Sequence, residues 1–274
     1  MLTKGEKGIL FLLECNNGQI SKLRLVKLLF LISMRIALYD FMPYKYGPFS
    51  FQLYHDLSRL EKDEWVSTDD SSVFLAKGDL PKIDSKIKNI IRMNSQRFAA
   101  LDDGMLLDYI YEKHPEYTIF SLYRRTMEYE RNSAGIATIG YEGKSIDKFL
   151  NELILNKINL VADVRRNAYS IKFGFQRSKL KNYLEKIDID YIHIPELGIS
   201  SDKRENLKTY EDYQALFAHY EDELETKKDY LDEIKSMGKN KKIALMCFEK
   251  DIKFCHRGII AKRLRADGIE VTDL

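Results

Sequence analysis

The first 79 residues combine helical spacing of apolar positions with short strand-like runs. Apolar residues recur every three or four positions in three segments, which predicts helices over residues 4–17, 22–38 and 51–64. Ser21 and Ser50 stand just before the second and third segments, where a hydroxyl can accept hydrogen bonds from the first N–H groups of a helix. Residues 64–78 contain two strand-like runs around a polar tip, which predicts a hairpin. Helices followed by a hairpin are the order of a winged helix-turn-helix domain.

The pattern changes twice further along the chain. Residues 80–133 stay helical and amphipathic, so we expect a helical linker that packs on one neighbouring domain or on both. From residue 134 to residue 274, short apolar runs alternate with helical segments. The expected strands cover residues 136–143, 159–166, 190–197, 241–249 and 269–274. This alternation is typical of a parallel sheet covered by helices on both faces. We therefore predict an α/β protein with a winged-helix-like domain (1–79), a linker (80–133) and a Rossmann-like domain (134–274).

Composition sets limits on the class of protein. The chain has 274 residues, of which 45% are hydrophobic and 31% are charged, as expected for one large or two ordinary globular domains. The net charge of +2 gives no general attraction to nucleic acid, so local patches must supply any such binding. Three cysteines indicate a reducing compartment and not a disulfide framework. The apolar run near the start is too short to span a bilayer, so we expect a domain helix, no membrane partner and a cytoplasmic location.

Chemically active residue types gather where the predicted strands end. Ligands of open parallel sheets bind beyond the carboxyl ends of the strands, so these residues should converge on one rim. The candidate catalytic residues are Asp163, His256, Cys255 and Glu249. The candidate substrate-binding residues are Gly140, Tyr141, Arg165, Arg166, Arg257 and Glu196. Asp163 would act as a base or an electrostatic stabiliser, His256 as an acid or base, and Cys255 as a nucleophile. The alternative for Asp163 is an ion pair with an arginine that only holds a loop.

The segment Cys255-His256-Arg257 permits several interpretations. It precedes a predicted helix, whose first N–H groups and the Arg257 guanidinium would suit a phosphate or carboxylate. A metal site would instead combine Cys247, Cys255 and His256, with His193 as a further ligand. The seven residues between the two cysteines match no compact zinc spacing. We therefore predict an anion-binding helix start, no metal ligand and no cofactor.

Basic residues of the first domain are the candidates for contact with nucleic acid, and duplex DNA is the expected partner. They are Lys22, Arg24, Lys27, Lys45 and Arg59. The alternative is an ordinary solvated helix face, in which case the domain would bind a protein partner.

Two regions resemble known families. The strings TIGYEGKSIDKFL, LVADVRR, YIHIPELG and ALMCFEKDIKFCHRGIIAKRL, between Ile136 and Leu274, resemble the domain-of-unknown-function family four-eight-eight. This resemblance implies a Rossmann-like fold with a site at the rim. Between Lys4 and Val66, KLRLVKLLFLISMR and FMPYKYGPFSFQLYHDLSRLEKDEWV are similar to the YwgA family and to Panacea-type antitoxin domains. That similarity implies a protein-interaction or nucleic-acid-binding module in prokaryotic regulation or defence.

Three functions follow from these expectations. The first is an enzyme, with a hydrolase as the candidate class, that acts on nucleic acid or a nucleotide bound by the winged helix and processed at the rim. The second is a DNA-binding regulator that senses a nucleotide, and the third is a protein-interaction module. The mixture of acid, base and thiol at the rim favours the enzyme, because an anion sensor needs cations but neither carboxylates nor a thiol. No strong catalytic spacing is present, so the reaction class stays open.

Overall fold

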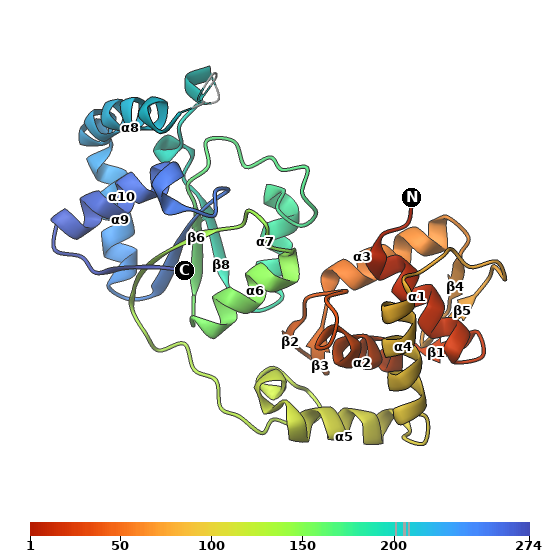
Figure 1. Cartoon of the computed structure of the whole chain (residues 1–274). Helices are drawn as coiled ribbons and strands as arrows, with labels where there is room; N and C mark the ends of the chain where they lie inside the picture. The colour runs from red at the N-terminus through yellow and green to blue at the C-terminus, as the bar shows by residue number, and fades with distance from the viewer. Residues whose placement is uncertain (201, 205–206, 208) are drawn as a thin grey trace. The chain divides into compact units, whose positions relative to one another are not determined.

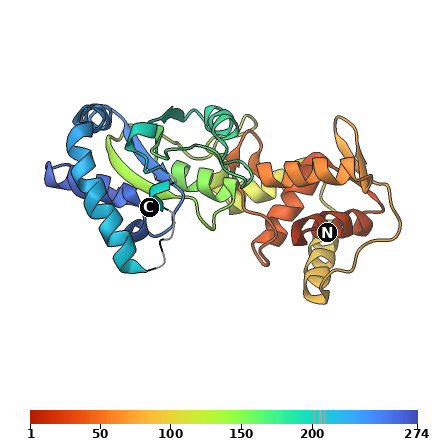
Figure 2. The same cartoon turned by 90° about the horizontal axis from the view of Figure 1, so that it is seen from above.

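The chain forms two compact units. The computed structural model describes residues 1–200, 202–204, 207 and 209–274. An N-terminal unit covers Met1–Tyr129 and a C-terminal unit covers Glu130–Leu274. Figures 1 and 2 show the elements of each unit in two views. Within the described ranges, no helix combines the length and the apolar character that crossing a membrane requires.

The N-terminal unit is mainly helical and carries two small antiparallel sheets. Its elements are α1 (Lys4–Cys15), β1 (Gln19–Ser21), α2 (Lys22–Ser33), β2 (Met42–Tyr44), β3 (Gly47–Phe49), α3 (Phe51–Lys62), β4 (Val66–Thr68), β5 (Ser72–Leu75), α4 (Ser85–Arg97), α5 (Asp103–Lys113) and η1 (Pro115–Thr118). The strands pair in the orders β1-β5-β4 and β2-β3. The predicted hairpin is β4 and β5, and the predicted caps are present: Ser21 accepts from Arg24 N, and Ser50 accepts from Leu53 N.

The segment predicted as a linker lies mostly inside this unit. Ile87 and Ile91 of α4 and Leu106 and Ile110 of α5 are buried in the same core as the apolar faces of α1, α2 and α3. The boundary between the units falls at Tyr129 and Glu130, near the end of the predicted linker. An amphipathic pattern alone cannot say which core its apolar face joins, and this choice is made by tertiary packing.

The C-terminal unit is an α/β domain around one parallel sheet, which confirms the predicted fold class. Its strands are β6 (Gly135–Gly140), β7 (Leu160–Asp163), β8 (Asp190–His193), β9 (Lys242–Cys247) and β10 (Val271–Asp273). Its helices are α6 (Ile146–Leu155), α7 (Arg177–Glu185), α8 (Tyr210–Leu224), α9 (Lys228–Gly238) and α10 (His256–Ala266), with short 3-10 turns η2 (Pro195–Leu197), η3 (Asp202–Arg204), η4 (Glu225–Lys227) and η5 (Ile252–Phe254). The strands are parallel in the order β10-β6-β9-β7-β8.

Helices cover both faces of this sheet. Figure 1 shows α6 and α7 on one side and α8, α9 and α10 on the other. Side chains alternate between faces along a strand, so Ile243, Leu245 and Cys247 of β9 pack toward the second group of helices. The same alternation divides the strand-end residues between the two faces of the sheet.

The buried Lys27 predicts a pH-dependent stability of the N-terminal unit. Its side chain is 3% exposed and donates to Pro48 O over 2.9 Å, and burial lowers its pKa from 10.5 to about 7. Between these pH values the unfolded chain binds a proton that the folded chain does not. The free energy of unfolding should therefore rise with pH from about 7 to 10, by at most about 1.4 kcal/mol per pH unit. Lys27→Met should be more stable than the wild type at pH 7 and should lack this rise.

Trp65 is the only tryptophan of the chain and packs against the core of the N-terminal unit, so its fluorescence during urea unfolding measures this unit. The matched control is Lys62→Met on the exposed surface of α3, which should keep the wild-type dependence on pH. Equal slopes for the wild type and Lys27→Met would contradict the prediction.

Candidate functional site

A cavity of about 450 Å³ opens at the carboxyl ends of the central strands, where the strand-end rule predicts a site. We call it the rim cavity. It is lined by Tyr141, Arg165, Arg166, Asn167, Tyr169, Ser170, Ile171, Ile199, Cys247, Phe248 and Glu249. Strand β9 lies between β6 and β7, so the loops that follow these three strands are neighbours. Four of the residues predicted at the rim line the cavity, namely Tyr141, Arg165, Arg166 and Glu249, and Cys247 of the alternative metal set lines it as well.

Asp163 and Arg165 form a buried ion pair at the end of β7. Asp163 Oδ1 accepts from Arg165 Nε over 2.8 Å, and Oδ2 accepts from Nη2 over 2.6 Å. Tyr191 Oη donates to the same Oδ2 over 2.7 Å. Asp163 is fully buried and is not among the residues that line the rim cavity. This geometry fits the alternative given above for Asp163, in which its ion pair with an arginine holds a loop.

Arg165 reaches further protein acceptors. Its Nη1 donates to Tyr141 Oη over 2.9 Å and to Phe175 O over 3.1 Å. Burial alone would lower the pKa of Arg165, but the hydrogen bonds and the charge of Asp163 raise it. The Tyr141 ring stacks on Phe175 with centroids 4.2 Å apart. Arg165 therefore positions the cavity wall, because its donors are used by protein acceptors. One face of Tyr141 is already covered.

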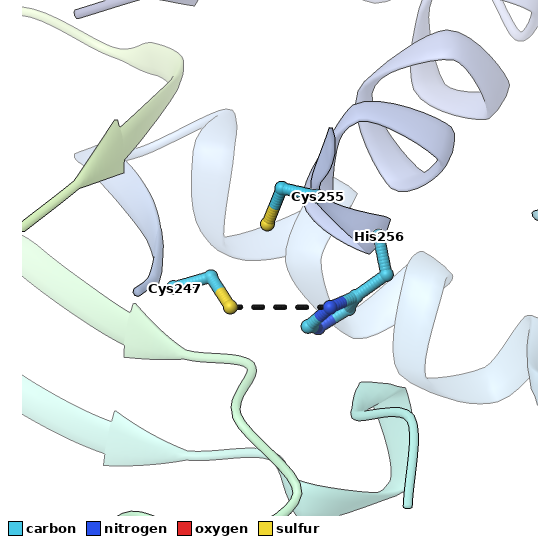
Figure 3. Close-up of side chains that lie close together, drawn as sticks. All are labelled: Cys247, Cys255 and His256. Carbon is cyan, nitrogen blue, oxygen red and sulfur yellow. Dashed lines mark hydrogen bonds between the residues drawn. The ribbon is translucent and has the colours of Figure 1, made fainter. Parts of the chain in front are cut away.

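Cys247, Cys255 and His256 meet on the other face of the sheet, and we call them the thiol–imidazole cluster. Cys247 ends β9, Cys255 is the N-cap of α10, and His256 is its first helical residue. All three are buried, and one possible ligand atom of each lies within 4.8 Å of the others. Figure 3 shows the three side chains converging, with 3.9 Å between Cys247 Sγ and His256 Nδ1. The predicted acid–base residue His256 and the predicted nucleophile Cys255 do not line the rim cavity, whereas Cys247 does.

The hydrogen bond of His256 to the backbone sets the orientation of its ring. Its Nε2 lies 2.9 Å from Val164 O. A carbonyl oxygen only accepts, so Nε2 donates to Val164 O, and Nδ1 is the ring nitrogen on the side of Cys247. Cys247 Sγ also lies 3.0 Å from Glu249 Oε2. The neighbouring Cys255 thiol and burial raise the pKa of Cys247 well above its ordinary value, so the thiol alone is a weak nucleophile.

The expected anion-binding role of Arg257 is not supported. Its side chain is 1% exposed, and it donates to Glu249 O over 2.5 Å and to Lys250 O over 3.0 Å. Gly140 lies under the same loop, because a Cβ there would stand 1.9 Å from Glu249 O. Both residues therefore hold the loop after β9 against the sheet, and neither is placed to bind a substrate.

Other predicted residues lie away from the rim cavity. Glu196 lines a separate hollow with Arg166, Lys203 and other residues. His193 Nε2 lies 2.8 Å from Arg165 O, as expected for a histidine satisfied within the fold.

Sequence reasoning missed the segment after β7. Tyr169 and Ile171 are largely exposed and line the rim cavity, and Phe248 lines it from the loop after β9. The sequence does show aromatic and apolar residues in the loop that follows β7 and its charged last residue. The strand-end rule considers only the first few residues after a strand, so it does not include Tyr169 and Ile171.

The predicted nucleic-acid-binding residues of the N-terminal unit do not form one exposed surface. Lys27 is buried, and Arg24 donates to Leu101 O and Phe98 O, each over 2.6 Å. Arg59 lies 3.4 Å from Glu6. Lys22, Lys27 and Lys45 line a cavity of about 470 Å³. Lys27 and Arg24 satisfy backbone carbonyls, so they are not available to a phosphate in this structure.

The fold and the site define the C-terminal unit as a parallel α/β domain with a cavity at its strand ends. Residues 145–264 match the family described as Domain of unknown function DUF488, which confirms the resemblance of the C-terminal region. The matched range contains Asp163, Arg165, Glu249 and the whole thiol–imidazole cluster. Comparisons with curated proteins and with solved structures give no match. The similarity of the N-terminal region to YwgA and Panacea-type domains stays a prediction.

The ion pair at the end of β7 predicts a structural role for Asp163. Asp163→Asn leaves the buried Arg165 guanidinium without its counter-charge and should lower the free energy of unfolding of the C-terminal unit by about 3–5 kcal/mol. Hydrogen exchange of β7 and β8 amides measures this loss. Asp190→Asn, which removes an exposed pair with Lys241 at the other end of β8, is the control and should cost less than about 1 kcal/mol. Equal, small losses in both variants would argue for a catalytic Asp163.

Proposed function

We propose that the protein is an enzyme that acts on a nucleotide or on nucleic acid, with the rim cavity as its active site. The observation that carries this proposal is the composition of the cavity wall. A guanidinium, a carboxylate and exposed aromatic rings border one cavity at the carboxyl ends of β6, β7 and β9. Its volume of about 450 Å³ is in the range of small-molecule sites.

The wall offers groups for both parts of a nucleotide. Arg166 is exposed and lines the cavity, and an exposed guanidinium suits the binding of a phosphate. Tyr169 and Phe248 are 63% and 43% exposed, and such rings stack on bases. This pairing of a cation with aromatic rings supports a nucleotide over a simple inorganic anion.

Glu249 supports catalysis over sensing. Its carboxylate borders the cavity and lies 3.0 Å from Cys247 Sγ. A carboxylate at a phosphate site opposes binding of the anion, but it can accept a proton from an attacking water. We therefore favour hydrolysis as the reaction class, with Glu249 as the general base.

The N-terminal unit would bring the substrate. Its helices followed by the β4–β5 hairpin support the winged-helix interpretation, and Lys22 and Lys45 border its cavity. The similarity to YwgA and Panacea-type domains supports a setting in prokaryotic regulation or defence. The alternative functions are a DNA-binding regulator and a protein-interaction module, and turnover at the rim separates the enzyme from both.

The role of Arg166 is tested by nucleotide binding. A panel of nucleoside mono-, di- and triphosphates and short oligonucleotides is titrated into the full chain by calorimetry. For the ligand that binds, Arg166→Ala should weaken affinity about tenfold or more, because a charge-assisted hydrogen bond contributes about 1.5–3 kcal/mol. Lys181→Ala removes an exposed cation of α7 that pairs with Glu185 outside the cavity, and it should bind like the wild type. No binding by any member of the panel would overturn the proposed substrate class.

The catalytic role of Glu249 is tested by turnover of the ligand so identified. Glu249→Gln should reduce the rate constant about 100-fold or more while changing affinity by less than about threefold, because the amide keeps the shape but cannot accept the proton. Product is measured by chromatography, with Glu185→Gln on α7 as the control. A ligand that binds and is never converted would favour the nucleotide-sensing regulator.

A further inference from the structure

We propose that Cys247, Cys255 and His256 bind a divalent transition metal, and that Zn²⁺ is the ion their chemistry suits best. Two thiolates and one imidazole are the donors that zinc takes in proteins, whereas magnesium and calcium take oxygen. This reverses the prediction from sequence that the chain has no metal ligands. Metal binding can be measured without substrate, so it stands apart from the proposed function.

The separations within the cluster fit a tetrahedral ion. Zinc lies about 2.3 Å from sulfur and about 2.0–2.1 Å from nitrogen, so its ligand atoms stand about 3.5–3.8 Å apart. Cys247 Sγ and His256 Nδ1 are 3.9 Å apart, and all three ligand atoms lie within 4.8 Å of one another. These separations are slightly larger than those around a bound ion, so metal binding would draw the three donor atoms closer together.

An independent observation comes from the partner of the imidazole. Metal-bound histidines commonly donate their other ring N–H to a carbonyl or carboxylate, which fixes the tautomer and the ring orientation. His256 has this arrangement, with Nε2 at 2.9 Å from Val164 O and Nδ1 toward the thiols. The carbonyl belongs to the residue that follows β7, so a strand end of the sheet supports the imidazole.

The electrostatics of burial favour the same assignment. Cys247, Cys255 and His256 are each at most 1% exposed. Two thiolates and a neutral imidazole balance the charge of a dication, which gives a site without net charge in a poorly solvated interior. Cys247 lies at the end of β9, and Cys255 and His256 lie at the start of α10. These two regular elements therefore fix the positions of all three proposed ligands.

Three protein ligands leave room for a fourth group. Structural zinc sites are closed by four protein ligands, whereas catalytic sites have three and a position for water or substrate. Cys247 belongs both to the cluster and to the wall of the rim cavity, and Glu249 lies 3.0 Å from its sulfur. The metal site therefore lies next to the cavity and not in a remote part of the domain.

The test begins with metal content and with cobalt as a spectroscopic probe. The full chain, expressed in zinc-containing medium and purified without chelator, should contain about one zinc per chain by elemental analysis. After removal of zinc, Co²⁺ should produce sulfur-to-metal charge-transfer and tetrahedral ligand-field absorption, and added Zn²⁺ should abolish both. A metal content far below stoichiometric, together with no charge-transfer band, would overturn the proposal.

Variants assign the site to its ligands. Cys247→Ser, Cys255→Ser and His256→Gln should each weaken Co²⁺ binding about tenfold or more and reduce the absorption band. Cys15→Ser is the matched control, because Cys15 lies on α1 in the N-terminal unit, and it should bind like the wild type. Unchanged affinity in all three cluster variants would show that the ion is adventitious.

Alkylation of the wild type covers the case in which a buried variant fails to fold. Iodoacetamide labelling mapped by mass spectrometry should modify Cys247 and Cys255 faster after chelation and slower after zinc is restored. Cys15 is the internal control and should be modified at the same rate in both states. Labelling that does not depend on metal, or a disulfide between Cys247 and Cys255 in protein as isolated, would overturn the proposal.

Discussion

The position of β9 between β6 and β7 is the constraint on which both candidate sites depend. Parallel pairing brings the carboxyl ends of the three strands to one edge, and Gly140 of β6 lies beside Cys247 of β9 in the register. Because side chains alternate between the faces of a sheet, residues at this edge separate into two groups. Asp163, Arg165 and Tyr141 gather on one face, and the thiol–imidazole cluster gathers on the other. The rim cavity touches both groups through Arg165 and Cys247.

Two buried arginines stabilise the loops that shape this edge, and they do so by different means. The charge of Arg165 is balanced by Asp163 over two hydrogen bonds. Arg257 instead donates to the carbonyls of Glu249 and Lys250, which fixes the loop that carries Glu249. Arg166 is the neighbour that stays exposed and can meet a ligand. The sequence pattern predicts the same substrate-binding role for all three arginines. Burial makes Arg165 and Arg257 structural residues and leaves Arg166 exposed.

A metal next to the rim cavity would connect the two proposals. A zinc ion held by Cys247, Cys255 and His256 would leave a position for an exchangeable ligand and would supply a water of lowered pKa. Glu249 lies next to Cys247, so a carboxylate would stand close to such a water. Hydrolysis by a metal-activated water needs no thiolate nucleophile. The proposals of nucleotide binding by Arg166 and of metal binding by the thiol–imidazole cluster nevertheless rest on separate experiments, and either can be wrong without the other.

The sequence by itself determined the local elements and the general place of the site. Periodicity predicted the alternating strands and helices of the C-terminal unit, and serine caps located the starts of α2 and α3. The strand-end rule predicts Tyr141, Arg165, Arg166 and Glu249 at the rim, and these four residues line the rim cavity. The rule needs only chain direction and strand position.

Only the tertiary structure decided how these residues combine. The face on which each residue lies depends on strand register, which separated Asp163 from His256. Tertiary packing made Lys27, Arg24 and Arg257 donors to backbone carbonyls, although the sequence marks them as candidate ligand contacts. The loop and short turn between β9 and α10 brought Cys255 back beside Cys247, although their spacing in the chain matched no compact zinc motif. A metal recognises the positions of donor atoms in space, and linear spacing predicts them only where the intervening backbone is already known.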